Sequence, residues 1–411
     1  MNTLIKSALV IDPQSPHHGK TRDIHIRNGV ISEIAARIDA PKASVIKGKG
    51  LHISPGWIDL RANFRDPGAE YKETFRSGSE AAKAGGFTRV VLMPSTAPAV
   101  DHKAGVEYVV SKNPQLPVHL YATCTLSAHH EGKQLSEMAD MSAAGAIAFT
   151  DDKSPVSTEL MSRALEYSRN LGGLVMTFPL DPGINPGAMM HEGPTSTAMG
   201  LKGTPALAEE LRVHRDLELL KYSGGRLHIS LISTAGSVEL IRKAKKSGLQ
   251  VTCAVAAHQL AFTDEDMIGF DSNLKVLPPF RSSADRKALI AGLKDGTIDA
   301  ICSDHSPEDH EHKVLEWEYA NYGMSSIQTA FHCALQSTEG KLDTAELIGK
   351  FTSGPARVLG VNMSVIREGE PAEITVFSTE ERTHFTRTNW KSLSLNSPFL
   401  GKELKGRVHM I

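Results

Sequence analysis

The chain has 411 residues, 40% of them hydrophobic and 22% charged, which suits a globular protein with one large domain and a small one, or two domains of ordinary size. Its formal net charge of -2 gives no electrostatic reason to expect nucleic acid or an anionic membrane as a partner. No apolar run approaches the roughly 20 residues that span a bilayer, and the N-terminus lacks the apolar region and cleavage site of a signal peptide, so no membrane partner is expected.

Both ends of the chain, residues 1–53 and 362–411, are predicted to be β structure. The N-terminal stretch predicts a strand that ends in a turn at Asp12-Pro13. Four further short strands with alternating hydrophobicity are expected, at Asp23–Ile26, Val30–Ile34, Ala372–Phe377 and Arg407–Ile411. Two β segments that flank a larger region suggest that both termini fold together into one small β-sandwich domain.

Residues 54–361 alternate short apolar runs with amphipathic stretches, the pattern of a parallel sheet covered by helices. Eight strands are expected, at Trp57–Leu60, Arg89–Met93, Val118–Ala122, Ala146–Thr150, Leu174–Thr177, Arg226–Ile232, Val251–Val255 and Ile298–Ser303. Eight strands alternating with helices over about 300 residues favour an α/β fold of the (β/α)8 TIM barrel type. A doubly wound open sheet is the alternative, since the number of strands does not exclude it.

Three of the intervening helices have clear end signals. Glycines that break helices follow each of them, at Lys72–Ala84, Pro205–Tyr222 and Ser237–Lys246. Thr204 is the expected N-cap of the second, because Pro205 suits the first helical position.

The four cysteines, Cys124, Cys253, Cys302 and Cys333, are widely separated and form no CxxC pair. Three of them lie in apolar runs, where a buried free thiol is expected. This usage suits the reducing cytoplasm, which is the predicted location.

In a barrel of this type, functional side chains lie at the carboxyl ends of the strands. Several polar or charged residues follow the predicted strands, and they are the candidate site: Arg61, Asn63, Arg65, Asp151, Asp152, Asp304 and His305. Phe178 and Leu231 follow two other strands.

The chain resembles the dihydroorotases of the amidohydrolase superfamily along nearly its whole length. The matching segments occur in the family's order: Pro55–Asp59, Arg65–Gly68, Lys72–Thr74, Gly85–Thr88, Met93–Thr96, Ala148–Asp152, Glu192–Pro194, Val276–Arg281, Asp295–Asp299, Ser303–His305 and Ser397–Val408. Hydantoinases and allantoinases share the fold, but Arg65–Gly68 followed by Lys72–Thr74 points to dihydroorotase.

The resemblance implies an enzyme that cyclises carbamoyl aspartate to dihydroorotate, and reverses this reaction, with zinc as the expected cofactor. The family's first strand ends in His-x-His, where this chain has Arg61-Ala62-Asn63. The histidines that should follow the fifth and sixth strands are Phe178 and Leu231. A guanidinium stays protonated and cannot bind zinc, and an amide oxygen is a poor substitute for imidazole. All four histidine ligands are therefore absent.

The carboxylates of the family's site are retained. Asp304 matches the aspartate that binds metal and acts as general base, and Asp151 or Asp152 matches the bridging ligand. Two carboxylates without imidazoles make at best a weak oxygen site for a hard cation. We therefore predict a degenerate metal site with no zinc, in which Asp304 is vestigial.

The resemblance also identifies a substrate pocket that is partly changed. Arg65 matches the arginine that pairs with the substrate carboxylate, and His305 matches a substrate-contacting histidine. Ser95 and Leu277 stand where the family has asparagines, so two polar contacts that support discrimination are missing. Gly323 matches the flexible loop that covers the substrate.

A buried carboxylate is costly unless something neutralises it. We therefore expect the Arg61 guanidinium to pair with Asp304 or with the Asp151-Asp152 pair, in the place of the metal's charge. Other polar side chains are predicted to be unremarkable: Glu308, His310 and His312 as solvated loop residues, His129 and His130 as surface residues, and His258 as a core histidine. Arg65 could equally bind a ligand or tie loops together.

Three functions remain open. The first is an inactive dihydroorotase homologue, a structural or regulatory subunit that supports aspartate transcarbamoylase or forms a homo-oligomer. The second is an active cyclic-amide hydrolase with a rebuilt site, which would use either one metal held by Asp304, Asp151 and His258 or His305, or no metal at all. The third is a sensor that binds a small carboxylate through Arg65.

Overall fold

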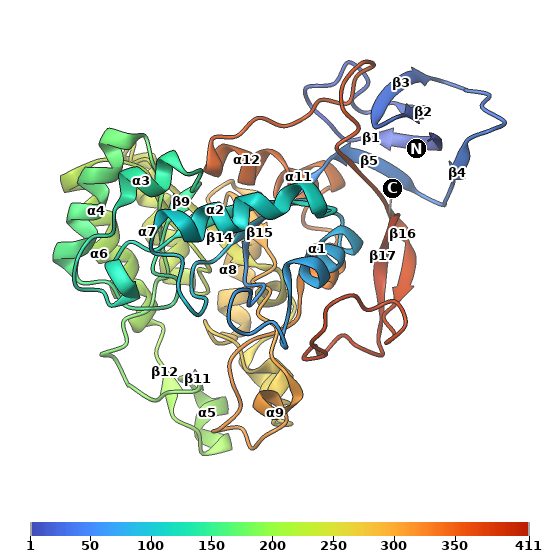
Figure 1. Ribbon diagram of the computed structural model, residues 1–411. Coiled ribbons are helices and arrows are strands. Elements are labelled where there is room, and N and C mark those ends of the chain that lie inside the picture. Colours follow the sequence, from blue (N-terminus) through green and yellow to red (C-terminus); the bar gives the residue numbers. More distant parts are fainter. Residues whose placement is uncertain (1, 410–411) are drawn as a thin grey trace.

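The computed structural model describes residues 2–409 and consists of a (β/α)8 barrel with a small β-sandwich domain built from both termini (Figure 1). The predicted fold class is confirmed. The N- and C-terminal strands lie together at one end of the molecule, beside the barrel (Figure 1). No helix within residues 2–409 is long and apolar enough to cross a membrane.

All eight predicted barrel strands are present, in parallel and in chain order around the barrel. They are β6 (Trp57–Ala62), β7 (Phe87–Leu92), β8 (His119–Cys124), β9 (Ala148–Phe149), β10 (Val175–Thr177), β13 (Leu227–Ile229), β14 (Val251–Ala256) and β15 (Ala300–Cys302). The barrel closes where the chain beyond β15 meets β6, because the Asn63 amide donates to the His305 carbonyl over 2.8 Å. This closure excludes the open-sheet alternative.

Alternating residues of the strands separate two apolar cores. Ile58, Leu60 and Val91 point into the barrel, whereas Trp57 and Phe87 pack on its outside beneath the helices. The inward-facing core continues to the carboxyl end of the barrel, where Phe178 and Leu231 belong to it. The strands are buried on both faces, which explains their continuous apolar runs.

The helices that cover the barrel include the three that were predicted. The helices within residues 2–409, of which α5 and α9 lie in loops beyond the barrel end, are α1 (Phe75–Ala84), α2 (Lys103–Lys112), α3 (Met138–Ala143), α4 (Thr158–Leu171), α5 (Pro194–Met199), α6 (Leu207–Ser223), α7 (Ala235–Lys246), α8 (Ser283–Lys294), α9 (His310–Lys313), α10 (Ala330–Ser337), α11 (Thr344–Gly349) and α12 (Ser353–Leu359). α1 begins at Phe75 because Thr74 accepts from the Ser77 amide as an N-cap.

The predicted N-cap of α6 is wrong. Thr204 belongs to β12 (Gly203–Thr204), which pairs with β11 (Met190–His191), and the residue before the helix is Ala206. The strand pairing holds the Thr204 backbone extended, three residues before the helix begins at Leu207.

The terminal strands form one hydrogen-bonded sheet in the order β17-β16-β5-β1-β2-β3, with β4 paired to β1. Their bounds are β1 (Asn2–Val10), β2 (Thr21–Arg27), β3 (Val30–Ala35), β4 (Ser44–Ile46), β5 (Leu51–Pro55), β16 (Ile374–His384) and β17 (Glu403–His409). The two ends of the chain meet where β5 runs antiparallel to β16. All the predicted terminal strands are present, although the last two residues of Arg407–Ile411 lie outside the described residues.

Candidate functional site

Arg61 lies at the centre of the carboxyl end of the barrel. Its Nε donates to Asp304 Oδ1 over 2.9 Å, and its Nη2 donates to Asp152 Oδ1. All three residues are buried, with 3%, 4% and 8% of their surfaces exposed for Arg61, Asp304 and Asp152. The expected pairing is therefore present in the structure, and the carboxylates that make it are those of Asp304 and Asp152.

Lys153 adds a fourth charge to this cluster. Its Nζ lies 3.4 Å from Asp304 Oδ2, so Asp304 faces a cation on each oxygen. Burial raises the pKa of Asp152, but Arg61 and Lys153 outweigh this and hold it below its usual value. Burial likewise opposes the charge of Arg61, whose pKa the two carboxylates nevertheless raise. Two cations and two anions make a cluster that is neutral as a whole, the condition under which buried charges are tolerated.

Asp151 lies outside this cluster. Its carboxylate accepts from the Ser127 amide at 3.0 Å and from the Ser127 hydroxyl at 2.5 Å. Asp59 on β6 is also held by a serine, Ser303, and burial raises its pKa to about 7 against the hydrogen bonds of Ser303. These two carboxylates serve local hydrogen bonding near the site.

Apolar side chains close the remaining side of the Arg61 cluster. Phe178 is 6% exposed and Leu231 is fully buried, and the Arg61 guanidinium lies 5.8 Å from the centre of the Phe178 ring. Leu277 is partly buried against the same core. Apolar side chains of the inward-facing core thus pack beneath the Arg61 guanidinium.

Asn63 and Ser95 join the loops that follow β6 and β7. The Asn63 amide group donates to Ser95 Oγ over 3.2 Å and its oxygen accepts from the Arg65 amide over 2.8 Å. The Ser95 hydroxyl in turn donates to Asp152. Both side chains have protein partners and help to hold the cluster.

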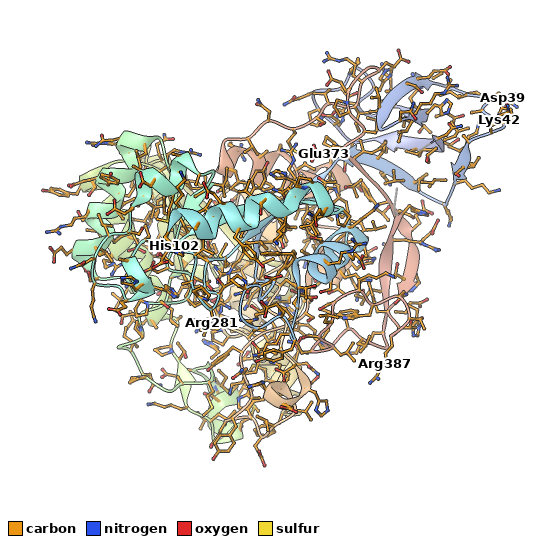
Figure 2. All side chains as sticks on the ribbon, in the orientation of Figure 1. Asp39, Lys42, His102, Arg281, Glu373 and Arg387 are labelled. Carbon is orange, nitrogen blue, oxygen red and sulfur yellow. The ribbon has the colours of Figure 1, made fainter. Side chains whose placement is uncertain are left out.

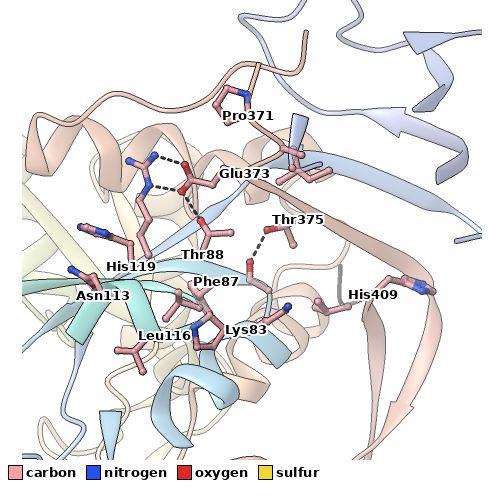
Figure 3. A pocket seen from close by; sticks show the side chains of 18 of the residues that line it. Lys83, Phe87, Thr88, Asn113, Leu116, His119, Pro371, Glu373, Thr375 and His409 are labelled. Carbon is pink, nitrogen blue, oxygen red and sulfur yellow. Dashed lines mark hydrogen bonds and ion pairs between the residues drawn. The ribbon is translucent and has the colours of Figure 1, made fainter. Parts of the chain in front are cut away.

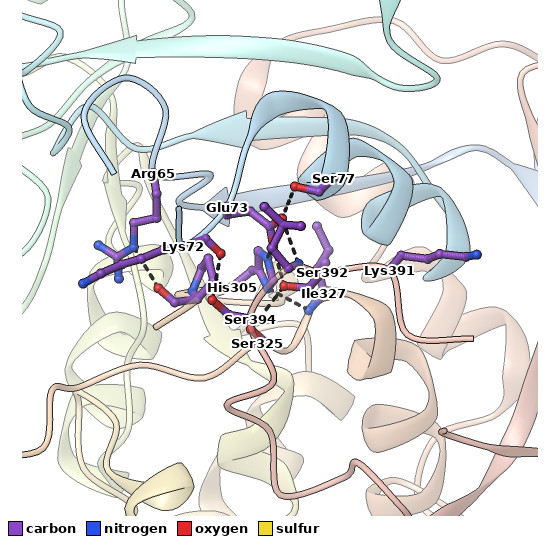
Figure 4. A network of polar contacts seen from close by, with 12 residues as sticks. Arg65, Lys72, Glu73, Ser77, His305, Ser325, Ile327, Lys391, Ser392 and Ser394 are labelled. Atoms are coloured by element: carbon purple, nitrogen blue, oxygen red, sulfur yellow. Dashed lines mark hydrogen bonds and ion pairs between the residues drawn. The ribbon is translucent and has the colours of Figure 1, made fainter. Parts of the chain in front are cut away.

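His305 is buried in a polar network under the C-terminal segment (Figure 4). Its Nδ1 accepts from the Ser326 amide over 3.1 Å, so its Nε2 carries the proton and faces Glu73 Oε2 at 3.3 Å. Glu73, which has no exposed surface, also accepts from Ser392 and Ser77. Both ring nitrogens are engaged by the protein.

Arg65 and Gly323 lie in loops at the barrel mouth. Arg65 Nη2 donates to Glu308 Oε1 over 2.6 Å, and its Nε donates to the Pro307 carbonyl. Gly323 has a φ of 144°, and a Cβ there would meet the Ser306 carbonyl oxygen at 2.5 Å, so only glycine fits. The Gly323 amide donates to the Lys275 carbonyl.

The prediction that Glu308 is a solvated loop residue is wrong, because it is only 4% exposed and paired with cations from another loop. His310 and His312 are exposed as predicted, and His258 is buried as predicted. His129 is exposed, whereas His130 is half-buried, with its Nε2 on the Asp151 carbonyl.

Sequence reasoning also missed Lys153 and Glu73 as parts of the site. The signal for Glu73 was present, since it lies in a motif directly before a helix. Lys153 follows the two aspartates at a strand end, and that position could have drawn attention to it.

The residues of this site do not fit zinc. A zinc centre uses imidazole, thiolate or carboxylate donors around one open position. Arg61, Phe178 and Leu231 offer none of these, and Arg61 already occupies the carboxylates of Asp152 and Asp304. Within residues 2–409, no three His, Cys, Asp or Glu side chains are grouped to hold a metal ion.

Two buried or partly buried arginines outside this site, Arg89 and Arg281, bind separate parts of the chain together. A cavity of about 670 Å³ lies at the opposite end of the barrel, between the starts of β7 and β8 and the terminal sheet (Figure 3). There Arg89 binds both carboxylate oxygens of Glu373, at 2.5 and 2.6 Å, and so joins the two domains. Arg281 (Figure 2) is buried and donates to Ser233 Oγ and the Thr204 carbonyl.

Comparison with known proteins places this geometry in context. The family model described as dihydro-orotase-like matches residues 50–237. A dihydroorotase of Syntrophus aciditrophicus (strain SB) is 41% identical over 415 residues, covering 100% of this chain and 97% of that protein. A dihydroorotase of Pelotomaculum thermopropionicum is 40% identical and covers 99% of this chain and 96% of its own. The structure of an L-hydantoinase from Arthrobacter aurescens aligns with a TM-score of 0.83 at 22% identity, over 99% of this chain and 94% of the other.

Proposed function

The chain belongs to the dihydroorotase family, and we propose that it is a catalytically inactive member that serves as a structural or regulatory subunit. The observation that carries the proposal is the position of Arg61, whose guanidinium pairs with Asp304 and Asp152. The family resemblance assigns Asp304 to the metal site, and Asp152 is one of the two neighbouring aspartates, Asp151 and Asp152, that could match the bridging ligand. A permanently charged guanidinium cannot activate a water molecule as a bound metal does.

Asp304 and His305, two retained candidates for a base at the barrel mouth, support the same proposal because both are already bound within the protein. Asp304 accepts from Arg61 on one oxygen and lies near Lys153 on the other. Both nitrogens of His305 are used within the protein. Hydrolysis or closure of a cyclic amide near neutral pH needs a positioned base and an activated nucleophile.

We propose aspartate transcarbamoylase as the partner, with self-association as the alternative assembly. The support is lineage, since pyrimidine biosynthesis is the pathway of this family. A homologue without catalytic activity can still serve as a structural subunit of an enzyme assembly. The four free, buried cysteines agree with a cytoplasmic location for such an assembly.

Elemental analysis combined with a carbamoyl aspartate cyclisation assay, with and without added zinc, tests the inactivity. We expect zinc far below one ion per chain and no turnover, while the dihydroorotase of Syntrophus aciditrophicus is assayed alongside. Stoichiometric zinc together with turnover would refute the proposal. Size-exclusion chromatography with the aspartate transcarbamoylase of the same organism tests the partner, and separate elution of the two proteins counts against it.

A further inference from the structure

The carboxylate of Glu308 is bound by three side chains at the mouth of the barrel. Arg65 Nη2 donates to Oε1 over 2.6 Å. Lys72 Nζ and Asn321 Nδ2 donate to Oε2 over 2.7 and 3.1 Å. Figure 4 shows Arg65 and Lys72 together on the side of the network away from Ser77. Both oxygens of Glu308 therefore have charged partners.

This arrangement has the chemistry of a carboxylate-binding site. An arginine and a lysine on one carboxylate provide charge-assisted hydrogen bonds to both of its oxygens, which is how proteins hold anionic ligands. The site is also rigidly built. The Glu308 amide donates to Asn396 Oδ1 over 3.1 Å, and Arg65 Nε donates to the neighbouring Pro307 carbonyl over 3.0 Å.

Glu308 supplies the buried negative charge that faces both Arg65 and Lys72. The side chains of Lys72 and Glu308 are only 10% and 5% exposed, and that of Arg65 is 21% exposed. Asp309 lies 3.7 Å from Lys72 but also pairs with His312. Without the Glu308 carboxylate, two largely buried cations would face a space of carboxylate size, which is unfavourable unless another anion enters.

We propose that Glu308 is an internal carboxylate that occupies an anion site formed by Arg65, Lys72 and Asn321, and that it thereby excludes free carboxylic acids from the barrel mouth. The inference rests on the proposed function, because it describes how the mouth of an inactive barrel is closed. The ligand class of the latent site is a small carboxylic acid. Arg65 is then unavailable to a carboxylate sensor in the protein as it stands.

The test is the variant Glu308→Gln, with Glu311→Gln as the matched control, since Glu311 is an exposed residue of α9, three residues further along the chain. Binding of N-carbamoyl-L-aspartate is measured by calorimetry, and its effect on the melting temperature is followed in parallel. We expect Glu308→Gln to bind at least roughly tenfold more tightly than the wild type, the factor that one charge-assisted hydrogen bond supplies. The control variant should match the wild type, and adding Arg65→Gln to Glu308→Gln should remove the gain.

Equal affinity of the wild type and Glu308→Gln overturns the proposal, as does a folded Glu308→Gln that binds no ligand. Should Glu308→Gln fail to fold, Glu308→Asp takes its place, because it keeps the charge but withdraws the carboxylate from Arg65. Tighter binding by Glu308→Asp than by the wild type supports the proposal, and its absence overturns it. These readouts involve neither zinc nor turnover, so their failure leaves the test of inactivity untouched.

Discussion

Arg61 Nε donates to Asp304 Oδ1 over 2.9 Å, so a residue of the first barrel strand is bound to a residue of the loop that follows the last barrel strand. The backbone closes the barrel at the same place, through Asn63 and His305. A salt bridge and a backbone hydrogen bond therefore both join the first barrel strand to the chain that follows the last one. Arg61 contributes to the closure of the fold as well as to the charge balance of the site.

Replacing Arg61 by methionine should strongly destabilise the protein. Asp152 and Asp304 would keep their burial and lose their main cation, which typically costs about 3–5 kcal/mol. The triple variant Arg61→Met, Asp152→Asn, Asp304→Asn should recover most of this loss, because it removes the charges together. Urea unfolding measures the free energy of unfolding of the single variant and of the triple variant. Arg163→Met, at an exposed position, is the control, and a single variant no less stable than this control would contradict the expectation.

Replacing Leu231 by alanine should open a cavity in the barrel core. Leu231 is fully buried against Phe178 and its neighbours, and a buried leucine-to-alanine change typically costs about 2–5 kcal/mol. Urea unfolding measures the loss. Leu211→Ala is the matched control on the exposed face of α6, where 45% of the residue is exposed and little change is expected. Similar losses in the two variants would mean that the barrel end is loosely packed.

The free energy of unfolding should depend on pH through His332. Burial lowers the pKa of this histidine from 6.5 to about 3, and neither ring nitrogen has a hydrogen-bond partner. Between these pH values the unfolded chain binds a proton that the folded chain does not, so stability falls as the pH is lowered from about 6.5. The protein is fully stabilised by the neutral imidazole only above that pH.

The variant His332→Phe should remove the part of this dependence that comes from His332, while His228 and His258, whose pKa burial also lowers, keep theirs. The phenylalanine ring suits the packing against Phe331 and Phe385. The stability of the variant relative to the wild type should improve on acidification by up to about 1.4 kcal/mol per pH unit within the window. Urea unfolding at several pH values between 4 and 7 checks this, with the exposed His310→Phe as control. Parallel curves for wild type and His332→Phe would show that the imidazole is not buried as described.

Replacing Glu73 by alanine should release the C-terminal segment from the barrel. Glu73 accepts from the Ser392 hydroxyl and from the Leu393 amide at 3.2 Å, and it faces His305 Nε2. We expect faster hydrogen exchange in residues 391–397, measured by mass spectrometry, because these contacts tie the segment down. Glu80→Ala, an exposed change on α1, is the control. Unchanged exchange in residues 391–397 would assign their order to other contacts.

Local patterns predicted the barrel and the terminal sheet because strands buried on both faces leave continuous apolar runs. They also predicted a partner for Arg61, since the carboxyl ends of all parallel strands converge. The backbone conformation determines that Asp152, and not Asp151, pairs with Arg61. Asp152 adopts a φ of 51° that turns it into the barrel, while Ser127 holds Asp151 aside. Neighbouring aspartates look alike in a sequence, so this choice needed the tertiary structure.

The burial of Glu308 is a second feature that local sequence patterns could not predict. The amino-acid sequence indicated the family and the positions of the barrel strands, because both depend on residue types in local segments. A charged residue in a polar loop is usually exposed, and nothing near Glu308 in the chain indicates otherwise. Arg65 and Lys72, more than two hundred residues earlier, supply the charges that allow it to be buried. The contact exists only in the folded barrel, which brings the loop after the first strand next to the loop after the last strand and so places Glu308 between Arg65 and Lys72.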